Sequence, residues 1–315
     1  MAGQSRKFIL PVFLLLMSSS VNPSDAMGLE RSNSGMLVDG LTPPKFGYII
    51  GGSEVNPDDS ERHKYMVHIR RFVIDDVTTN DTLSIPWCGG TLISEWHILT
   101  AAHCLFNDQG ELSNEIEIFL GVNAIPPNGL IELLYSTSTK RTVSMDGILI
   151  HDDFNQLGKG ENDIAILKMD TRVVLNENPG VSLIKLPEKC SDCTVDYAGK
   201  RIIAVGWGLT SSDGMSSPNM MQVELAVNSK EECEKQFSVA YNDEYQLCTV
   251  PSSTKGTCQG DSGGPIIVDG VQIGITSHGP AKCEEGGVYT RVSAYINNGW
   301  IADKMKDQKQ NLHFI

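Results

Sequence analysis

The sequence predicts an all-β protein with one helix near its C-terminus. Short apolar runs are separated by Gly, Pro, Asn and Asp at intervals of about ten residues, which is typical of barrels and sandwiches. The chain holds 30 Gly and 14 Pro among 315 residues, which favours a loop-rich β protein over a helical bundle. The one helical periodicity is formed near the end by Val292, Tyr295, Ile296, Ile301 and Met305.

Eight segments have the composition and alternation of strands, and 40% hydrophobic residues suffice for a sizeable core. The predicted strands are 65–72, 91–100, 116–120, 164–169, 201–205, 264–268, 271–277 and 287–292. Between them, the Pro, Gly and Asn of residues 175–187 predict a linker that separates two halves of the chain.

The charge balance and hydropathy exclude two classes of protein. The chain has 25 Lys and Arg against 39 Asp and Glu, a net charge of −14. A nucleic-acid binder needs a surplus of basic residues to neutralise phosphates, so no nucleic-acid partner is expected. A protein with several membrane spans is excluded because no run of 18 or more apolar residues occurs, and no membrane partner is expected.

The N-terminus has the pattern of a secretory signal peptide. Two basic residues precede the apolar stretch 8–17, and small residues follow it. We predict a signal peptide over residues 1–26, cut after Ser20 or Ala26, and an extracellular protein. The alternative is a short membrane anchor, but about ten apolar residues interrupted by Pro11 are too few to span a bilayer. Residues 27–48 are polar and aperiodic, and they predict a flexible propeptide.

Export changes how the 8 cysteines are interpreted. An even number in an exported chain indicates disulfides rather than a reduced metal site. Cys190 and Cys193 have the spacing of half a zinc site, but no second such pair accompanies them, so neither a metal nor a cofactor is predicted. Asn80 begins an Asn-Asp-Thr sequon in a polar stretch, which predicts glycosylation on an exposed loop.

Three short motifs carry the chemistry. An unbroken six-residue match, such as that of the motif that begins at Gly260, should arise by chance in on the order of one chain in 10⁵ of this length. All three occur, in the order His, Asp, Ser, which makes coincidence negligible. The motifs are Thr100-Ala101-Ala102-His103-Cys104, Asn162-Asp163-Ile164-Ala165-Ile166-Leu167 and Gly260-Asp261-Ser262-Gly263-Gly264-Pro265.

These residue types suit acyl transfer by a serine nucleophile. The Ser262 hydroxyl needs a neighbouring base to take its proton, and the imidazole of His103 titrates near neutral pH. A buried carboxylate, Asp163, would fix the tautomer of the imidazole and stabilise the imidazolium. The N–H groups of Gly260 and Ser262 would form the oxyanion hole, where one donor is typically worth ~10²–10³ in turnover.

On these motifs the chain resembles the chymotrypsin/trypsin family of serine endopeptidases, because subtilisin-like and α/β-hydrolase triads run in other orders. The resemblance covers essentially Ile49 to about Lys306, and the predicted peptidase domain spans residues 49–315. It implies two six-stranded antiparallel Greek-key β-barrels, at about 49–175 and 188–295, and a C-terminal helix at about 293–306. His103 and Asp163 would come from the first barrel and Ser262 from the second, with the site in the cleft between them.

The resemblance also implies a set of disulfides. The implied pairs are Cys88–Cys104, Cys233–Cys248 and Cys258–Cys283. A further bridge of the family is absent, because Ile202 and Val268 occupy its two positions. Cys190 and Cys193 are then left over, and we predict that they pair with each other in a tight loop.

The segment that begins at Ile49 resembles the mature N-terminus of the family. The implied activation is a cut between Tyr48 and Ile49, after which the new ammonium group pairs with Asp261 and orders the oxyanion loop. Tyr48 departs from the usual Arg or Lys before the cut. A protease that prefers aromatic residues is therefore expected to activate the chain.

The positions that match the family's specificity pocket carry no charge. Its base would be Gly256 and Thr257, and its walls Gly279 and Gly287. This composition predicts a deep slot for a large apolar or aromatic side chain. The alternative is acceptance of a basic side chain, if Glu284 or Glu285 of the bordering loop turns inward.

The edge strand that would pair with the substrate backbone is Ser277-His278-Gly279. The family usually places Trp where this chain has His278, so we interpret His278 as a subsite residue. The loop after Gly121, where the family binds calcium, offers no carboxylates over residues 122–127, and calcium is not predicted.

We therefore predict a secreted serine endopeptidase, made as a zymogen and cutting after large apolar or aromatic residues. Its expected partners are protein or peptide substrates and protein inhibitors of proteases, and it is expected to be a monomer. The alternative is a non-catalytic protease homologue that acts as a binding or regulatory protein. A lipase-like or esterase role is disfavoured because the chain lacks the GxSxG motif.

Overall fold

The computed structural model describes the chain from residue 49 to residue 306 with short gaps. The described ranges are 49–56, 62–76, 81–107, 109–125, 139–155, 160–190, 195–212, 214–238 and 241–306. Contacts divide the chain into two units, 1–45 and 46–315, and all described residues belong to the second. The predicted signal peptide and propeptide, and with them Tyr48, Asn80 and Cys193, lie outside the described residues.

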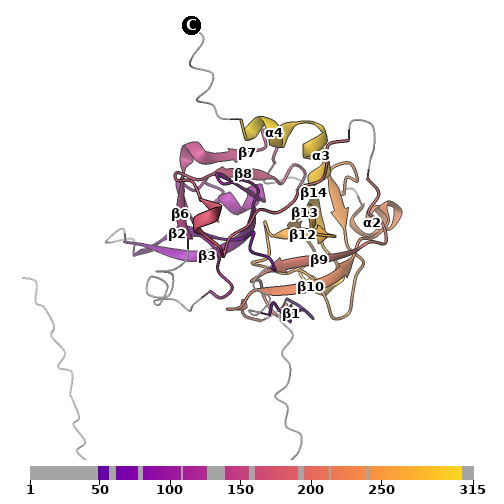
Figure 1. The fold of residues 1–315 in the computed structure, drawn as a ribbon. Coiled ribbons are helices and arrows are strands. Elements are labelled where there is room, and N and C mark those ends of the chain that lie inside the picture. The colour runs from indigo at the N-terminus through magenta and orange to yellow at the C-terminus, as the bar shows by residue number, and fades with distance from the viewer. Residues whose placement is uncertain are drawn as a thin grey trace, which may run out of the picture. The chain divides into compact units, whose positions relative to one another are not determined.

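The N-terminal half forms one antiparallel sheet (Figure 1). Its strands run in the order β6-β5-β2-β3-β4-β8-β7, so that most neighbours in sequence are neighbours in space. The strands are β2 (Met66–Asp76), β3 (Asp81–Leu92), β4 (His97–Thr100), β5 (Glu115–Leu120), β6 (Thr139–Ser144), β7 (Ile148–Ile150) and β8 (Ala165–Lys168).

The C-terminal half forms a second antiparallel sheet, in the order β1-β10-β9-β12-β13-β14-β11 (Figure 1). Alternation of buried and exposed residues is clearest in β10, where every second side chain faces the core. The strands are β1 (Ser53–Glu54), β9 (Arg201–Gly206), β10 (Met221–Ala226), β11 (Gln246–Cys248), β12 (Pro265–Val268), β13 (Val271–His278) and β14 (Val288–Arg291).

The all-β class and the two-sheet organisation are confirmed, but each sheet has seven strands instead of six. In the first sheet, a 3-10 turn at Met145–Gly147 separates β6 from β7, and neither of these strands was predicted. In the second sheet, the two-residue strand β1 from the start of the described chain pairs with the edge of β10. The predicted strand 91–100 is also two elements, because the turn between Leu92 and His97 separates β3 from β4.

The C-terminal helix is present but broken. It consists of α3 (Val292–Asn297) and α4 (Trp300–Lys304), and Gly299 between them has φ +88. Such a left-handed conformation is adopted readily by glycine and interrupts a helix. A further helix, α2 (Lys230–Phe237), was not predicted. Its N-cap Ser229 accepts from Glu232 N–H, so the Ser-x-x-Glu sequence was a usable signal.

The two sheets meet closely where the loop of the third motif crosses β3. Gly89 N–H donates to the Ser262 carbonyl at 2.8 Å. A Cβ on Gly89 would lie 3.3 Å from Gly264 Cα, so glycine permits this approach. A buried hydrogen bond from Thr91 Oγ1 to Gln272 Oε1, 2.7 Å long, links β3 to β13 nearby. The largest core cluster includes Ile275 and Tyr295, so it continues from the first sheet into the second half of the chain.

Candidate active site

His103 and Asp163 are brought together from two segments of the first sheet. His103 lies on a 3-10 turn, Ala102–Leu105, that follows β4, and Asp163 lies shortly before β8. His103 Nδ1 is 2.7 Å from Asp163 Oδ2, and His103 N–H donates to Asp163 Oδ1 at 2.9 Å. The carboxylate therefore fixes both the ring and the backbone of the histidine. The disulfide Cys88–Cys104 anchors the same turn to β3.

The second sheet holds the Asp163 carboxylate from the other side. Ser277 Oγ donates to Asp163 Oδ2 at 2.5 Å, and Thr290 Oγ1 donates to the Asp163 carbonyl at 2.8 Å. Tyr295 O–H donates to Oδ1 of the preceding residue, Asn162, at 3.0 Å. These contacts place an almost fully buried carboxylate, 2% exposed, at the junction of the two sheets.

Burial and pairing shift the pKa of both groups. Burial would raise the pKa of Asp163, but the His103 charge and the hydrogen bonds from His103 and Ser277 outweigh it and lower the pKa. Burial would lower the pKa of His103, but the Asp163 charge and hydrogen bond outweigh it and raise the pKa. The pair is thus an ionised carboxylate beside an imidazole of increased basicity. The His103 side chain is 32% exposed, so the ring is accessible from solvent.

Ser262 lies on a glycine-rich loop packed against the segment that leads to His103. A Cβ on the next residue, Gly263, would lie 2.2 Å from Thr100 Oγ1 and 3.3 Å from Ala101 N, and this glycine has φ +77. No hydrogen bond joins Ser262 Oγ to His103 among the described residues; the contact recorded for His103 Nε2 is Cys104 Sγ at 3.8 Å. The structure therefore pairs His103 with Asp163 and leaves Ser262 without a hydrogen bond to the imidazole. Nucleophile–base hydrogen bonds are often long before substrate binds.

The two predicted oxyanion donors lie on the same loop. Gly260 has φ +94, and a Cβ there would lie 3.0 Å from Gly208 Cα, so both conformation and space require glycine. Within the described part of the chain, neither Gly260 N–H nor Ser262 N–H donates a hydrogen bond. Both groups are available to an acceptor.

Ser262 borders a pocket of about 240 Å³. Five of the six predicted substrate-binding residues line it: Thr257, Ser277, His278, Gly279 and Gly287. The sixth, Gly256, does not; its N–H donates instead to the Ile50 carbonyl at 3.1 Å. The disulfide Cys258–Cys283 closes one side of the pocket.

Tyr289 stands behind the glycine wall of the pocket, a role that the sequence did not indicate. A Cβ on Gly287 would lie 2.6 Å from the Tyr289 hydroxyl, and that hydroxyl is 3.1 Å from Thr257 Oγ1. Tyr289 is 1% exposed, so a buried ring supports this wall from behind. No charged side chain is among the residues that line the pocket in the described structure.

Glu284 and Glu285, in the loop that borders the pocket, have their polar contacts outside it. Glu284 Oε2 accepts from Ser212 Oγ at 3.0 Å, and Glu285 Oε1 lies 4.0 Å from Lys282 Nζ. Both glutamates line a separate surface cavity with Pro251. Neither carboxylate supplies a charge to the pocket beside Ser262.

Asp261, which directly precedes Ser262, is buried. Its carboxylate accepts from Gly208 N–H at 2.8 Å and from Cys258 N–H at 2.9 Å. Burial raises the pKa of Asp261 to about 7 against the effect of these two hydrogen bonds. Among the described residues no cation pairs with it. Ile49 is fully buried. Ile50 packs with Cys258, so the predicted start of the mature chain lies in the interior of the second half.

The three disulfides that the resemblance implied are present. They are Cys88–Cys104, Cys233–Cys248 and Cys258–Cys283. Cys190 is also disulfide-bonded, while its predicted partner Cys193 lies outside the described residues.

The described residues hold one cluster with the spacing of a metal site, Cys88, His103 and Cys104. Because these two cysteines are joined in a disulfide, they cannot act as thiolate ligands. The described helices are all too short or too polar to cross a bilayer.

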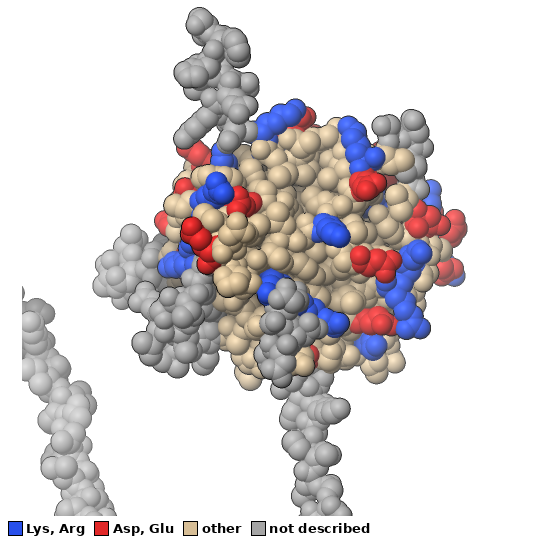
Figure 2. All heavy atoms as spheres, in the orientation of Figure 1, with Lys and Arg blue, Asp and Glu red and all other residues tan. Residues whose placement is uncertain are grey.

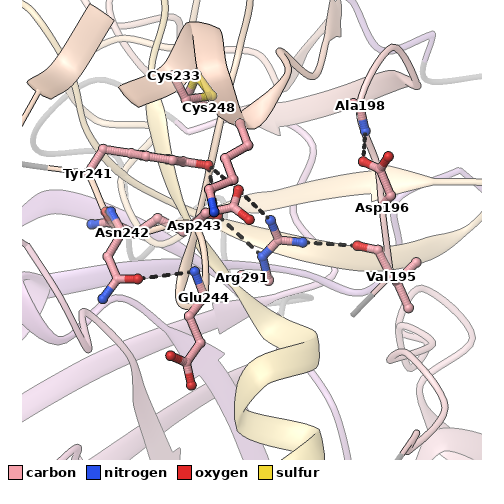
Figure 3. A network of polar contacts seen from close by, with 12 residues as sticks. Val195, Asp196, Ala198, Cys233, Tyr241, Asn242, Asp243, Glu244, Cys248 and Arg291 are labelled. Carbon is pink, nitrogen blue, oxygen red and sulfur yellow. Dashed lines mark hydrogen bonds and ion pairs between the residues drawn. A yellow bond between two sulfur atoms is a disulfide. The ribbon is translucent and has the colours of Figure 1, made fainter. Parts of the chain in front are cut away.

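A larger cavity, of about 720 Å³, lies beside α2, and none of His103, Asp163 and Ser262 lines it. Its polar groups pair with one another (Figure 3). Arg291 Nη2 lies 3.2 Å from Asp243 Oδ1, and Arg291 Nη1 donates to the Val195 carbonyl at 3.1 Å. Tyr241 O–H donates to the same Asp243 oxygen at 2.9 Å. We interpret this network as a structural one.

Comparisons with known proteins show the family to which the chain belongs. A family model described as Trypsin matches residues 49–301. A chymotrypsin from Phaedon cochleariae is 30% identical over 68% of this chain and 70% of its own length. Duodenase-1 from Bos taurus is 30% identical over 87% of this chain and 96% of its own. A solved structure described as "Structure of GrC" is 27% identical, covers 82% of this chain and 100% of that chain, and has a TM-score of 0.66. The resemblance inferred from the three motifs is confirmed: the chain belongs to the trypsin family of serine proteases.

Proposed function

We propose that this chain is a secreted serine endopeptidase, made as a zymogen, that hydrolyses peptide bonds through His103, Asp163 and Ser262. The observation that carries the proposal is the pairing of a solvent-accessible imidazole with a buried carboxylate beside a pocket bordered by Ser262. The raised pKa of His103 makes the ring a competent base for the serine hydroxyl.

In the proposed reaction, His103 Nε2 takes the proton of Ser262 as Oγ attacks the scissile carbonyl carbon. His103 Nδ1 keeps its hydrogen and donates it to the Asp163 carboxylate, which stabilises the imidazolium. The imidazolium then gives its proton to the leaving amine, and an acyl-enzyme on Ser262 remains. Water, activated by the same imidazole, hydrolyses the acyl-enzyme. Gly260 N–H and Ser262 N–H, which are both available, would hold the oxyanion in each step.

The specificity we propose is for a large apolar or aromatic residue before the cleaved bond. The pocket beside Ser262 is uncharged, and Gly279 and Gly287 leave its walls open. Glu284 is engaged by Ser212, so it does not provide a partner for a basic side chain. The relatives that match include proteins described as chymotrypsin and granzyme, so membership of the family does not by itself set this preference.

Activation is proposed to follow a cut between Tyr48 and Ile49. The new ammonium group would pair with Asp261, a buried carboxylate that has no cationic partner among the described residues. This ion pair would fix the loop that carries Ser262. Tyr48 is itself a large aromatic residue and fits the proposed pocket, so the enzyme can serve as its own activator.

Secretion is supported by the predicted signal peptide and by the disulfides, which form in oxidising compartments. Proteins and peptides are the proposed substrates, and protein inhibitors of proteases are further proposed partners.

On the face shown in Figure 2, acidic and basic side chains are interspersed, with no broad basic patch of the kind that binds nucleic acid.

A fluorophosphonate probe tests the proposal on the processed protein. We expect covalent labelling that Ser262→Ala abolishes, together with cleavage of a peptide library after Phe, Tyr, Trp, Leu or Met. Absence of labelling in correctly processed protein would favour the alternative, a non-catalytic homologue that binds. That alternative is favoured by one observation, the missing hydrogen bond between Ser262 and His103.

A further inference from the structure

His278 ends β13 at the rim of the pocket and is connected to the catalytic carboxylate. Ser277 Oγ donates to Asp163 Oδ2 at 2.5 Å and also lies 3.1 Å from His278 Nδ1. A hydroxyl carries one hydrogen, and here it is given to Asp163. Nδ1 of His278 must therefore carry a hydrogen and donate it to Ser277. The contact fixes the tautomer of this second imidazole.

The opposite edge of the ring is left with a lone pair. In the neutral ring with hydrogen on Nδ1, Nε2 is an acceptor. No described residue hydrogen-bonds to Nε2, and His278 is exposed where it lines the pocket. The Nδ1 edge, in contrast, is enclosed: a Cβ on Gly160 would lie 2.6 Å from Nδ1. The ring thus has one fixed edge and one free edge.

The charge state of His278 is set by its neighbours. Burial of the enclosed edge lowers the pKa of His278; the Asp163 charge opposes this, and the His103 charge adds to it. The pKa of His103 is raised. Because the reaction needs a neutral His103, it proceeds at pH values where His278 is neutral as well. Nε2 is then an acceptor throughout the working range.

We propose that His278 makes the subsite upstream of the cleaved bond a hydrogen-bond acceptor site, which selects peptides with a donor side chain there. The inference rests on the proposed function, because it assumes that the peptide runs along Ser277 and Gly279. Gly279 follows β13 and makes no backbone hydrogen bond to another described residue, so its main chain is available to such a peptide. An apolar side chain beside Nε2 would remove water from the acceptor without replacing its hydrogen bond.

The experiment compares peptides that differ by one hydroxyl. Substrates have Tyr before the cleaved bond and either Thr or Val, which have the same shape, at the second, third or fourth residue before it. A net hydrogen bond between neutral groups corresponds to about 2- to 10-fold in kcat/KM. We expect the wild type to prefer Thr by that factor at one of the three positions. The ratio of Thr to Val is measured within each protein, so general changes in activity cancel.

Two substitutions distinguish the effect of the Nε2 acceptor from the effect of the size of the His278 ring. His278→Phe keeps a ring but removes Nε2, and we expect its ratio to fall to about 1. His278→Gln places an amide oxygen near the position of Nε2 and should retain a preference for Thr. The matched control is His151→Phe, which removes an imidazole that does not line the pocket and should leave the ratio unchanged.

An equal ratio in the wild type and in His278→Phe would overturn the inference, as would a wild-type ratio of 1 at all three positions. If His278→Phe does not fold, the wild-type ratio and that of His278→Gln decide the question. Failure of the proposed function is distinct, because then neither peptide is cleaved and the fluorophosphonate probe does not label the wild type.

Discussion

Replacing Asp163 by Asn should change the tautomer of His103. The His103 N–H is a fixed backbone donor to Oδ1, at 2.9 Å, so the amide oxygen of Asn must occupy that position. The amide nitrogen then takes the place of Oδ2, 2.7 Å from His103 Nδ1. Two N–H groups cannot face each other at this distance, so the ring must carry its hydrogen on Nε2. In that tautomer Nε2 cannot accept the Ser262 proton.

The magnitude follows from what the reactive tautomer would cost. Returning the hydrogen to Nδ1 leaves a buried donor unsatisfied, about 1–3 kcal/mol. Loss of the carboxylate also removes charge-assisted hydrogen bonds to the imidazolium, about 1.5–3 kcal/mol. At about 1.4 kcal/mol for each tenfold change, the sum corresponds to roughly 10²- to 10⁴-fold in kcat. The same substitution in the family's template enzyme lowers kcat by about 10⁴.

The assay is kcat on an aromatic peptide substrate for processed Asp163→Asn. Asp170→Asn serves as the matched control, because Asp170 also accepts hydrogen bonds from two side chains, Thr142 and Ser144, but on the surface. We expect the control to stay within about twofold of wild type. Retention of a tenth or more of wild-type kcat by Asp163→Asn would refute the reasoning.

Three further outcomes are expected. Activity needs a neutral His103, and the pKa of His103 is raised above its ordinary value of 6.5. As the pH falls, kcat/KM should therefore be lost with a midpoint above 6.5, and a midpoint below 6.5 would contradict this. Gly287→Ala should lower kcat/KM for aromatic substrates by about tenfold or more, and for alanine substrates by less, because its Cβ meets the buried Tyr289. His68 packs on Trp207 and is 3% exposed; burial, aided by the Arg70 charge, lowers its pKa to about 3. In the unfolded chain, His68 binds a proton below about pH 6.5, while in the folded chain it stays neutral. The free energy of unfolding should therefore be about 3 kcal/mol lower at pH 4 than above pH 6.5. Denaturant unfolding of His68→Phe should give a free energy of unfolding that depends less on pH than that of the wild type. An equal pH dependence in the two proteins would contradict the lowered pKa of His68.

Local patterns predicted the strands that are short apolar runs, but they did not predict β6, whose sequence Thr-Lys-Arg-Thr-Val-Ser is largely polar. The segment 201–205 lies within β9, and 116–120 within β5. The segment 91–100 was wrong as a single strand because Ser94 forms a turn inside it. Its hydroxyl accepts from Trp96 N–H and His97 N–H, and this reverses the chain between two apolar runs.

The candidate catalytic residues could be named from contiguous motifs, but the groups that hold them could not. Thr290 donates to the carbonyl of Asp163 across 127 positions of sequence, and no local pattern marks that threonine. Ser277 was expected to contact substrate, yet it also donates to the Asp163 carboxylate. Such partners are fixed by the packing of the two sheets against each other, which a single sequence does not encode locally.

Gly256, predicted as the base of the pocket but found outside its lining, shows how far backbone geometry limits the choice of side chain. A Cβ on Gly256 would lie 2.0 Å from the Cys283 carbonyl oxygen, so any larger residue requires the neighbouring loop to move. The Gly256 N–H donates to the Ile50 carbonyl, which ties this position to the segment that follows Ile49. An acidic residue at this position would therefore require the backbone around Cys283 to shift, so the absence of a charge here is imposed by space as well as by sequence. Because Gly256 directly precedes the pocket residue Thr257, its hydrogen bond to Ile50 connects the segment after Ile49 to the edge of the pocket.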